Sequence, residues 1–134
     1  MAAIDVMRRY LRTVQDGDWE SAFGCFADDI VLHVPGRSSL AGVHRGRAAA
    51  EGYLRAALAR SHGAEVEVEL LDVLTSDERV ALIVRERFSR PGGPVEIRRA
   101  NLYRVRGQQI TEVRIFEADQ YEVDELLADD PPAG

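Results

Sequence analysis

Lysine is missing from this chain of 134 residues, and all 17 of its basic side chains are arginines. Cysteine occurs once, at position 25, so a disulfide within the chain is excluded. No apolar run approaches the roughly 20 residues that span a membrane, and the N-terminus lacks the basic and apolar regions of a signal peptide. These absences predict a cytoplasmic protein without a membrane partner.

Acidic residues outnumber the arginines and give the chain a formal net charge of −6. Affinity for phosphate backbones comes mainly from clustered basic residues, so this balance argues against a nucleic-acid partner. The three histidines, His33, His44 and His62, have no metal-ligand spacing. A glycine-rich phosphate loop and a nucleophile elbow are also absent from the sequence. We therefore expect neither a metal ion nor any other cofactor.

Composition favours one globular unit. Hydrophobic residues make up 46% of the chain and charged residues 30%, which is typical of a folded protein that buries a core. We expect a single domain over residues 1–128. Residues 129–134 read as a disordered C-terminal tail.

Hydrophobic periodicity divides the chain into a helical half and a strand half. Helices are expected over 3–16, in a short segment capped by Asp18 whose apolar face includes Trp19 and Phe26, and over 46–60, with a strand at 29–34. A half-buried strand follows at 65–70, where valine and leucine alternate with glutamate. Longer strands at 79–90, 95–106 and 110–116 and a short helix at 121–127 complete the prediction. This order indicates an α+β fold in which helices cover one face of a curved sheet.

The parity of the long strands predicts which side chains share a face. Glu86 alternates in phase with the apolar residues of its strand and should face the interior. Applied to the next two strands, the same reasoning places Arg99, Asn101 and Tyr103, then Glu112, Arg114 and Phe116, on the inner face. A buried carboxylate needs a partner, so we expect Glu86 to pair with Arg99 or Arg114.

Three side chains are candidates for proton transfer. His33 has a reference pKa near 6.5 and can act as acid or base near neutral pH; the alternative is a half-buried structural histidine. Asp119 follows the last strand and could cap the terminal helix; the other role, as a general acid or base, is one that the family resemblance given next implies. Glu86 could be a base, or only the partner of an arginine.

Several short segments, in this order and spacing, resemble the SnoaL-like domains of the nuclear transport factor 2-like and ketosteroid-isomerase-like superfamily. They are DWESAFGCFADD at 18–29, HVPG at 33–36, LAGVHRGR at 40–47, QQITE at 108–112 and FEADQYEVD at 116–124. The resemblance implies a cone-shaped, curved antiparallel or mixed sheet wrapped by N-terminal helices, the cystatin-like α+β barrel, with a pocket inside.

The resemblance also implies a function. We expect a small, cofactor-independent enzyme that acts by acid/base chemistry on a hydrophobic oxygenated molecule, as an isomerase or a polyketide cyclase does, and that forms a homodimer. The alternatives are an epoxide hydrolase-like enzyme and a non-catalytic small-molecule-binding protein. His33, Asp119 and Glu86 would carry the chemistry. The expected substrate-binding residues are Tyr10, Trp19, Phe26, Tyr53, Asn101, Tyr103, Arg114 and Phe116.

Overall fold

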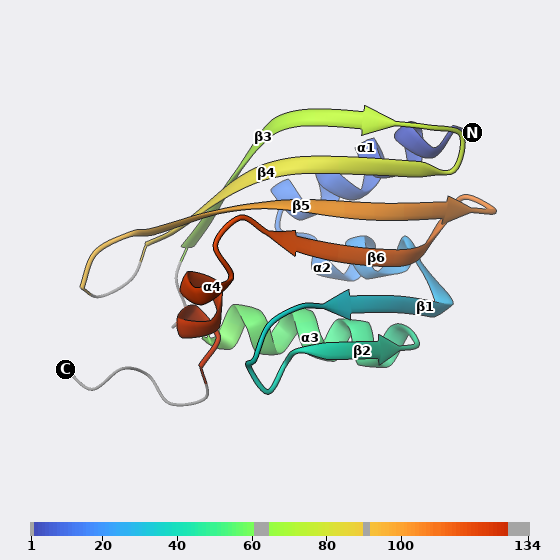
Figure 1. Ribbon diagram of the computed structural model, residues 1–134. Coiled ribbons are helices and arrows are strands. Elements are labelled where there is room, and N and C mark those ends of the chain that lie inside the picture. Colours follow the sequence, from blue (N-terminus) through green and yellow to red (C-terminus); the bar gives the residue numbers. More distant parts are fainter. Residues whose placement is uncertain (1, 61–64, 90–91, 129–134) are drawn as a thin grey trace.

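Three helices lie behind one curved six-stranded sheet, and a fourth closes one end of it (Figure 1). The structure is a computed structural model that describes residues 2–60, 65–89 and 92–128. The elements, in chain order, are α1 (Ala3–Gln15), α2 (Trp19–Gly24), β1 (Phe26–Val34), β2 (Gly42–Arg45), α3 (Arg47–Arg60), β3 (Glu65–Thr75), β4 (Arg79–Ser89), β5 (Val95–Arg106), β6 (Gln109–Glu117) and α4 (Gln120–Leu126).

The predicted helices are confirmed. Helix α1 buries Val6, Met7 and Tyr10 on one face and stops before Gly17, whose positive φ of 71° suits glycine. Asp18 caps α2 by accepting a hydrogen bond from the backbone N–H of Ser21 at 3.1 Å. These two caps turn the chain sharply, so that α1 and α2 pack on the same side of the sheet (Figure 1).

The strands follow the order β2-β1-β6-β5-β4-β3. Strands β3 to β6 form the predicted antiparallel meander, and β1 joins it by parallel pairing with β6, which makes the sheet mixed. Strand β2, which pairs antiparallel with β1, was not predicted from the sequence. It has only four residues and no buried position, so it lacks the alternation by which a half-buried strand is recognised.

The start of β1 and the burial of β3 differ from the sequence prediction. Phe26 belongs to β1 and not to the apolar face of α2, because the chain enters the sheet at once: the N–H of Ile110 donates to the carbonyl of Cys25 at 2.8 Å. Strand β3 is not half-buried where its side chains are described, and Val68, Leu70 and Leu74 are exposed. It is the edge strand, and the helices contact mostly the other strands.

Two hydrophobic clusters hold the layers together. The larger joins α1 and α2 to the helix-facing side of the sheet, and the smaller joins Phe88 and Ile97 to Val123 and Leu126 of α4. In the part of the chain that the structure describes, no helix has the length and apolar character to cross a membrane. The predicted tail over 129–134 lies outside the described residues.

Candidate functional site

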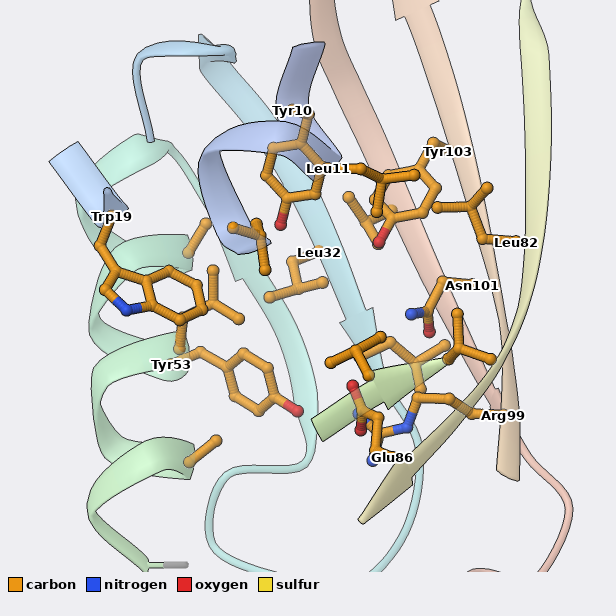
Figure 2. Close-up of a pocket in the computed structure, with 18 of the residues that line it drawn as sticks. Tyr10, Leu11, Trp19, Leu32, Tyr53, Leu82, Glu86, Arg99, Asn101 and Tyr103 are labelled. Atoms are coloured by element: carbon orange, nitrogen blue, oxygen red, sulfur yellow. The ribbon is translucent and has the colours of Figure 1, made fainter. Parts of the chain in front are cut away.

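A cavity of about 470 Å³ lies between the helix-facing side of the sheet and helices α1, α3 and α4. Its walls are mainly apolar, and polar groups project into it from a few positions (Figure 2). Six of the eight predicted substrate-binding residues line it: Tyr10, Trp19, Phe26, Tyr53, Asn101 and Tyr103. Its size and apolar character match those of small-molecule sites in proteins.

Strands β4 and β5 present the polar groups as their parity predicted. Glu86 lies in phase with Leu82 and Val84, and all three line the cavity. On β5, Arg99, Asn101 and Tyr103 occupy alternate positions of the same face. Figure 2 shows Tyr103, Asn101 and Arg99 one after another along the strand, with Glu86 beside Arg99.

A buried ion cluster closes one end of the cavity. The Arg99 guanidinium donates from Nε and Nη2 to the two carboxylate oxygens of Glu117, at 2.9 and 2.8 Å, and its Nη1 lies 3.4 Å from Oε2 of Glu86. The side chains of Glu117, Arg99 and Glu86 are 3%, 12% and 17% exposed. The predicted pairing of Glu86 with Arg99 is thus confirmed. Two carboxylates share one cation, so the cluster has one negative charge in excess when both are ionised.

Burial sets the proton affinity of this cluster. Burial raises the pKa of the Glu117 carboxyl; the Arg99 guanidinium offsets part of this effect, and the charge of Glu86 adds to it. Burial acts to lower the pKa of Arg99, but the two carboxylates together hold it above its ordinary value. The arginine therefore stays charged, and a proton taken up by the cluster resides on a carboxylate.

Glu117 is the residue that sequence reasoning missed. The pairing of β5 with β6 shifts register between Arg104 and Val105, so the alternation along β6 changes phase after Ile110. As a result Val113, Ile115 and Glu117 face inward. The apolar character of Val113 and Ile115 is a signal that could have indicated this phase.

The same change of phase makes the prediction for Arg114 and Phe116 wrong. Both project from the face of the sheet away from the helices, and their exposed fractions are 47% and 54%. Arg114 contacts Glu112 at 3.4 Å instead of Glu86. Neither residue lines the cavity.

The prediction that His33 faces the pocket is also wrong. Its neighbour Leu32 lines the cavity, and successive side chains of a strand point to opposite faces. His33 pairs in register with Arg114 on the outer face, and its Nε2 lies 3.6 Å from Oε2 of Glu112. The histidine therefore has an acidic partner, but that partner is outside the cavity.

Asp119 fulfils the alternative role left open for it. It is the N-cap of α4, and its Oδ1 accepts from the backbone N–H of Glu122 at 3.2 Å. The residue is exposed and does not line the main cavity. The structure thus does not bring His33 and Asp119 together, and of the three predicted catalytic side chains only Glu86 lies in the cavity.

Three tyrosines bring hydroxyl groups to the cavity. Burial raises the pKa of Tyr53 to about 12 and raises the pKa of Tyr10 and of Tyr103 well above the ordinary value. The rings of Tyr10 and Tyr103 contact each other, with centroids 5.9 Å apart. All three phenols therefore stay protonated near neutral pH and can donate hydrogen bonds.

The arrangement of elements and cavity has known counterparts. The family profile of the SnoaL-like domain matches residues 7–113. This chain belongs to the SnoaL-like family. An uncharacterised protein of Mycobacterium tuberculosis, Rv0034, is similar to this SnoaL-like chain, with 37% identity over 119 residues that cover 88% of this chain and 90% of the relative.

Solved structures share the SnoaL-like fold. A Xanthomonas campestris protein of unknown function with a cystatin-like fold is 27% identical, covers 96% of this chain and 99% of its own, and superposes with a TM-score of 0.86. Rv0760c of M. tuberculosis, solved in complex with estradiol-17β-hemisuccinate, is 23% identical, with coverages of 86% and 93% and a TM-score of 0.70. The fold of this SnoaL-like chain is therefore the α+β, nuclear transport factor 2-like and cystatin-like fold expected from the sequence.

The chemistry available in this SnoaL-like site is proton transfer and hydrogen bonding. Within residues 2–60, 65–89 and 92–128, no group of three or more histidine, cysteine or acidic side chains could hold a metal ion. The cavity instead combines two carboxylates, a guanidinium, two amides and three phenols within mainly apolar walls.

Proposed function

We propose that this protein is a cofactor-independent enzyme that moves a proton on a hydrophobic, oxygenated small molecule, with Glu86 as the acid/base. One observation carries the proposal: the Glu86 carboxylate lines an otherwise largely apolar cavity and touches the guanidinium of Arg99. A carboxylate in such surroundings is desolvated and held in place, as a general base must be. The reaction class is isomerisation or aldol-type cyclisation next to a carbonyl.

In the proposed step, Glu86 takes the proton from a carbon next to the substrate carbonyl, and the electron pair of that C–H bond moves to the carbonyl oxygen as an enolate. Protonated phenols of the cavity, such as Tyr10 or Tyr103, donate hydrogen bonds to the developing oxyanion. The proton then returns from Glu86 to another carbon, which completes an isomerisation with no net gain or loss of atoms. In a cyclisation the enolate carbon attacks a second carbonyl instead, and the alkoxide that forms takes the proton back from Glu86.

Ligand size and polarity support the same proposal. The cavity of about 470 Å³ accommodates a molecule of two to four fused rings between apolar walls. Rv0760c, which shares the fold, was solved with a steroid derivative bound. We extend that class of ligand to this chain as a proposal, and we expect a ring compound that has at least one carbonyl or hydroxyl oxygen.

Deuterium exchange tests the proposal without knowledge of the natural substrate. In D₂O, 2-tetralone exchanges the hydrogens next to its carbonyl slowly, and NMR follows the loss of their signal. We expect the wild-type protein to accelerate this exchange above the buffer rate and Glu86→Gln to lose at least about 100-fold of the acceleration, since general base catalysis contributes 10²–10⁴-fold.

The matched control is Glu112→Gln, which removes a carboxylate of the outer face. This variant should exchange at the wild-type rate. Equal rates for the wild-type protein and Glu86→Gln would refute the role of Glu86. No acceleration by the wild-type protein, together with a rise in Tm on adding 2-tetralone, would favour the non-catalytic ligand-binding alternative.

Epoxide opening is the second candidate, and the position of Asn101 favours it. Figure 2 shows the Asn101 amide next to Arg99 and Glu86, where a water could be held between an amide and an acid. Glu86 would take a proton from that water as its oxygen attacks an epoxide carbon and the bond from that carbon to the ring oxygen breaks. The proton would then pass from Glu86 to the ring oxygen, which ends as a hydroxyl. Incubation of cyclohexene oxide with the protein in H₂¹⁸O would give labelled diol if this candidate is correct, and no diol above background if it is not.

We further infer that the outer face of the sheet binds a second copy of this chain. A row of residues in register crosses all six strands on that face: Leu74, Ala81, Leu102, Arg114, His33 and Val43. Leu74 is 55% exposed, and Phe116 lies two residues from Arg114 on the same strand. Exposed apolar groups on one face are typical of interaction sites.

The outer face carries both acidic and basic groups, so two copies of this face can be complementary in charge. Glu69 on β3 forms an ion pair with Arg85 on β4, so an acidic group adjoins a basic one on this face. A two-fold axis through the face would place Glu69 of one copy near Arg85 of the other. Light scattering should give a dimer for the wild-type protein and a monomer for Phe116→Glu; a monomeric wild-type protein would overturn the inference.

A further inference from the structure

Asn101 has an acceptor without a partner. Its side-chain oxygen, Oδ1, is buried and accepts no hydrogen bond from any described residue. Asn101 also lines the cavity, between the hydroxyl end of Tyr103 and the Glu86–Arg99 pair (Figure 2). A buried polar atom that lacks a partner is destabilising, so native proteins seldom retain one without a function.

The nitrogen of the same Asn101 amide does have a hydrogen-bond partner. The Asn101 side chain hydrogen-bonds to the Tyr103 hydroxyl and acts to lower the pKa of that phenol, which is the effect of an N–H donating to the phenolic oxygen. The Tyr103 oxygen is thus an acceptor for Asn101, and its own O–H remains a donor. Oδ1 of Asn101 and O–H of Tyr103 therefore form an acceptor and a donor side by side at the cavity wall.

We propose that this acceptor–donor pair selects a ligand that carries a hydroxyl group on its apolar frame. A hydroxyl satisfies both partners, because its hydrogen bonds to Oδ1 of Asn101 and its oxygen accepts from Tyr103. A ketone or an ether satisfies only Tyr103 and leaves Oδ1 without a partner. The inference rests on the proposed function in one respect, that this cavity is the ligand site, and it specifies the substrate class as hydroxylated ring compounds.

The pair predicts a particular order of affinities. Leaving a buried acceptor unpaired weakens binding by about tenfold or more, and sites built around a hydroxyl can reject analogues without it far more strongly. A water retained at Oδ1 would remove this difference in affinity. The comparison of ligands that share one ring system therefore decides whether the ligand or a water is the partner of Oδ1. Glu86 takes no part in this discrimination and can act on a carbon next to a carbonyl elsewhere on the same hydroxylated ligand.

The test measures the binding of three probes by titration calorimetry. The probes are 2-naphthol, 2-methoxynaphthalene and 2-acetylnaphthalene, which share one ring system and carry a hydroxyl, an ether and a ketone. We expect the wild-type protein to bind 2-naphthol at least about tenfold more tightly than the other two. Quenching of Trp19, which lines the cavity and is the single tryptophan of the chain, provides an independent reading of the same site.

Two variants separate the acceptor from the donor. Asn101→Leu removes the acceptor at nearly constant size and should weaken 2-naphthol to the level of the ketone while leaving the ketone unchanged. Tyr103→Phe removes the donor but keeps the ring, and it should weaken both 2-naphthol and the ketone. Circular dichroism establishes that each variant is folded before its affinity is compared.

Three results of these binding measurements would overturn different parts of the proposal. Equal affinity of the wild-type protein for the three probes overturns the hydroxyl preference and leaves the proposed function intact. Absence of binding by any probe overturns both the preference and the proposal that this cavity is a ligand site. A preference for 2-naphthol that survives in Asn101→Leu shows that another group selects the hydroxyl, and it overturns the assignment to Asn101.

Discussion

Replacing Arg99 by methionine tests whether one guanidinium stabilises two carboxylates inside the protein. Methionine keeps an unbranched side chain but removes the cation, so Glu86 and Glu117 lose their shared partner. Removing one partner of a buried ion pair costs about 3–5 kcal/mol. At an unfolding entropy of about 2.1 cal/mol/K per residue, a loss of about 4 kcal/mol lowers the Tm of this chain by about 14 °C.

The pH dependence of this loss follows from the carboxyl groups. Without the guanidinium, the effects of burial and of the Glu86 charge are no longer offset, and the pKa of Glu117 in the folded state rises further. A carboxyl whose pKa is higher in the folded than in the unfolded state binds its proton more tightly when folded, so stability falls as pH rises through that interval. Arg99→Met should therefore lose most of its stability at pH 8 and little at pH 4.5, near the ordinary glutamate value.

Thermal unfolding followed by circular dichroism at pH 4.5, 6 and 8 provides the measurement. The matched control is Arg98→Met, because Arg98 is exposed on the outer face and its loss should change stability by no more than about 0.5 kcal/mol. Adding Glu117→Gln to Arg99→Met should restore part of the stability at pH 8. A Tm decrease for Arg99→Met that is small, or equal at pH 4.5 and 8, would refute the reasoning.

Two further predictions concern the structure around the site. Asp119→Ala removes the cap of α4 and should lower stability by about 1 kcal/mol, seen in chemical denaturation, while the exchange rate of 2-tetralone stays unchanged, in contrast to a catalytic role for this residue. Gly36→Ala should destabilise more than Gly42→Ala in the same assay: both glycines have positive φ, but only at Gly36 would a methyl group meet the side chains of Asp124 and Gln120. Equal effects of the two alanines would show that only the backbone angle matters.

The sequence predicted the positions of side chains wherever alternation continues without interruption. On β4 apolar residues occupy alternate positions on either side of Glu86, and on β5 Arg99 and Asn101 share the phase of buried Ile97 and Tyr103. The inward placement of these polar residues therefore followed from the period of two. The resemblance to the SnoaL-like family gave the fold, because order and spacing of several weak segments together are specific. The helix caps Asp18 and Asp119 could be read from residue type and position.

The errors arise where geometry depends on a neighbouring strand. The phase of β6 changes at an irregularity in its pairing with β5, and a local pattern does not reveal such a shift, so Glu117 was missed and Arg114 misplaced. His33 was chosen for its chemistry and its resemblance to a family position, although its neighbour Leu32 occupies the inward phase of β1. Residue type thus predicted a possible role, but strand pairing decided the position.

The parallel pairing of β1 with β6 has a consequence for folding during synthesis. Leu32 pairs with Val113, so β1 gains its second sheet neighbour, β6, only after β2 to β5 have been made. Until then the β1–β2 pair and the β3–β5 meander are separate pieces of the sheet, and each has an edge strand that lacks its neighbour β6. Contacts between such distant parts of a chain form slowly, because the intervening loop must first be closed. Strand β6 therefore completes the sheet after the other described strands have been made, and the interval before β6 pairs is when aggregation or chaperone binding competes with folding.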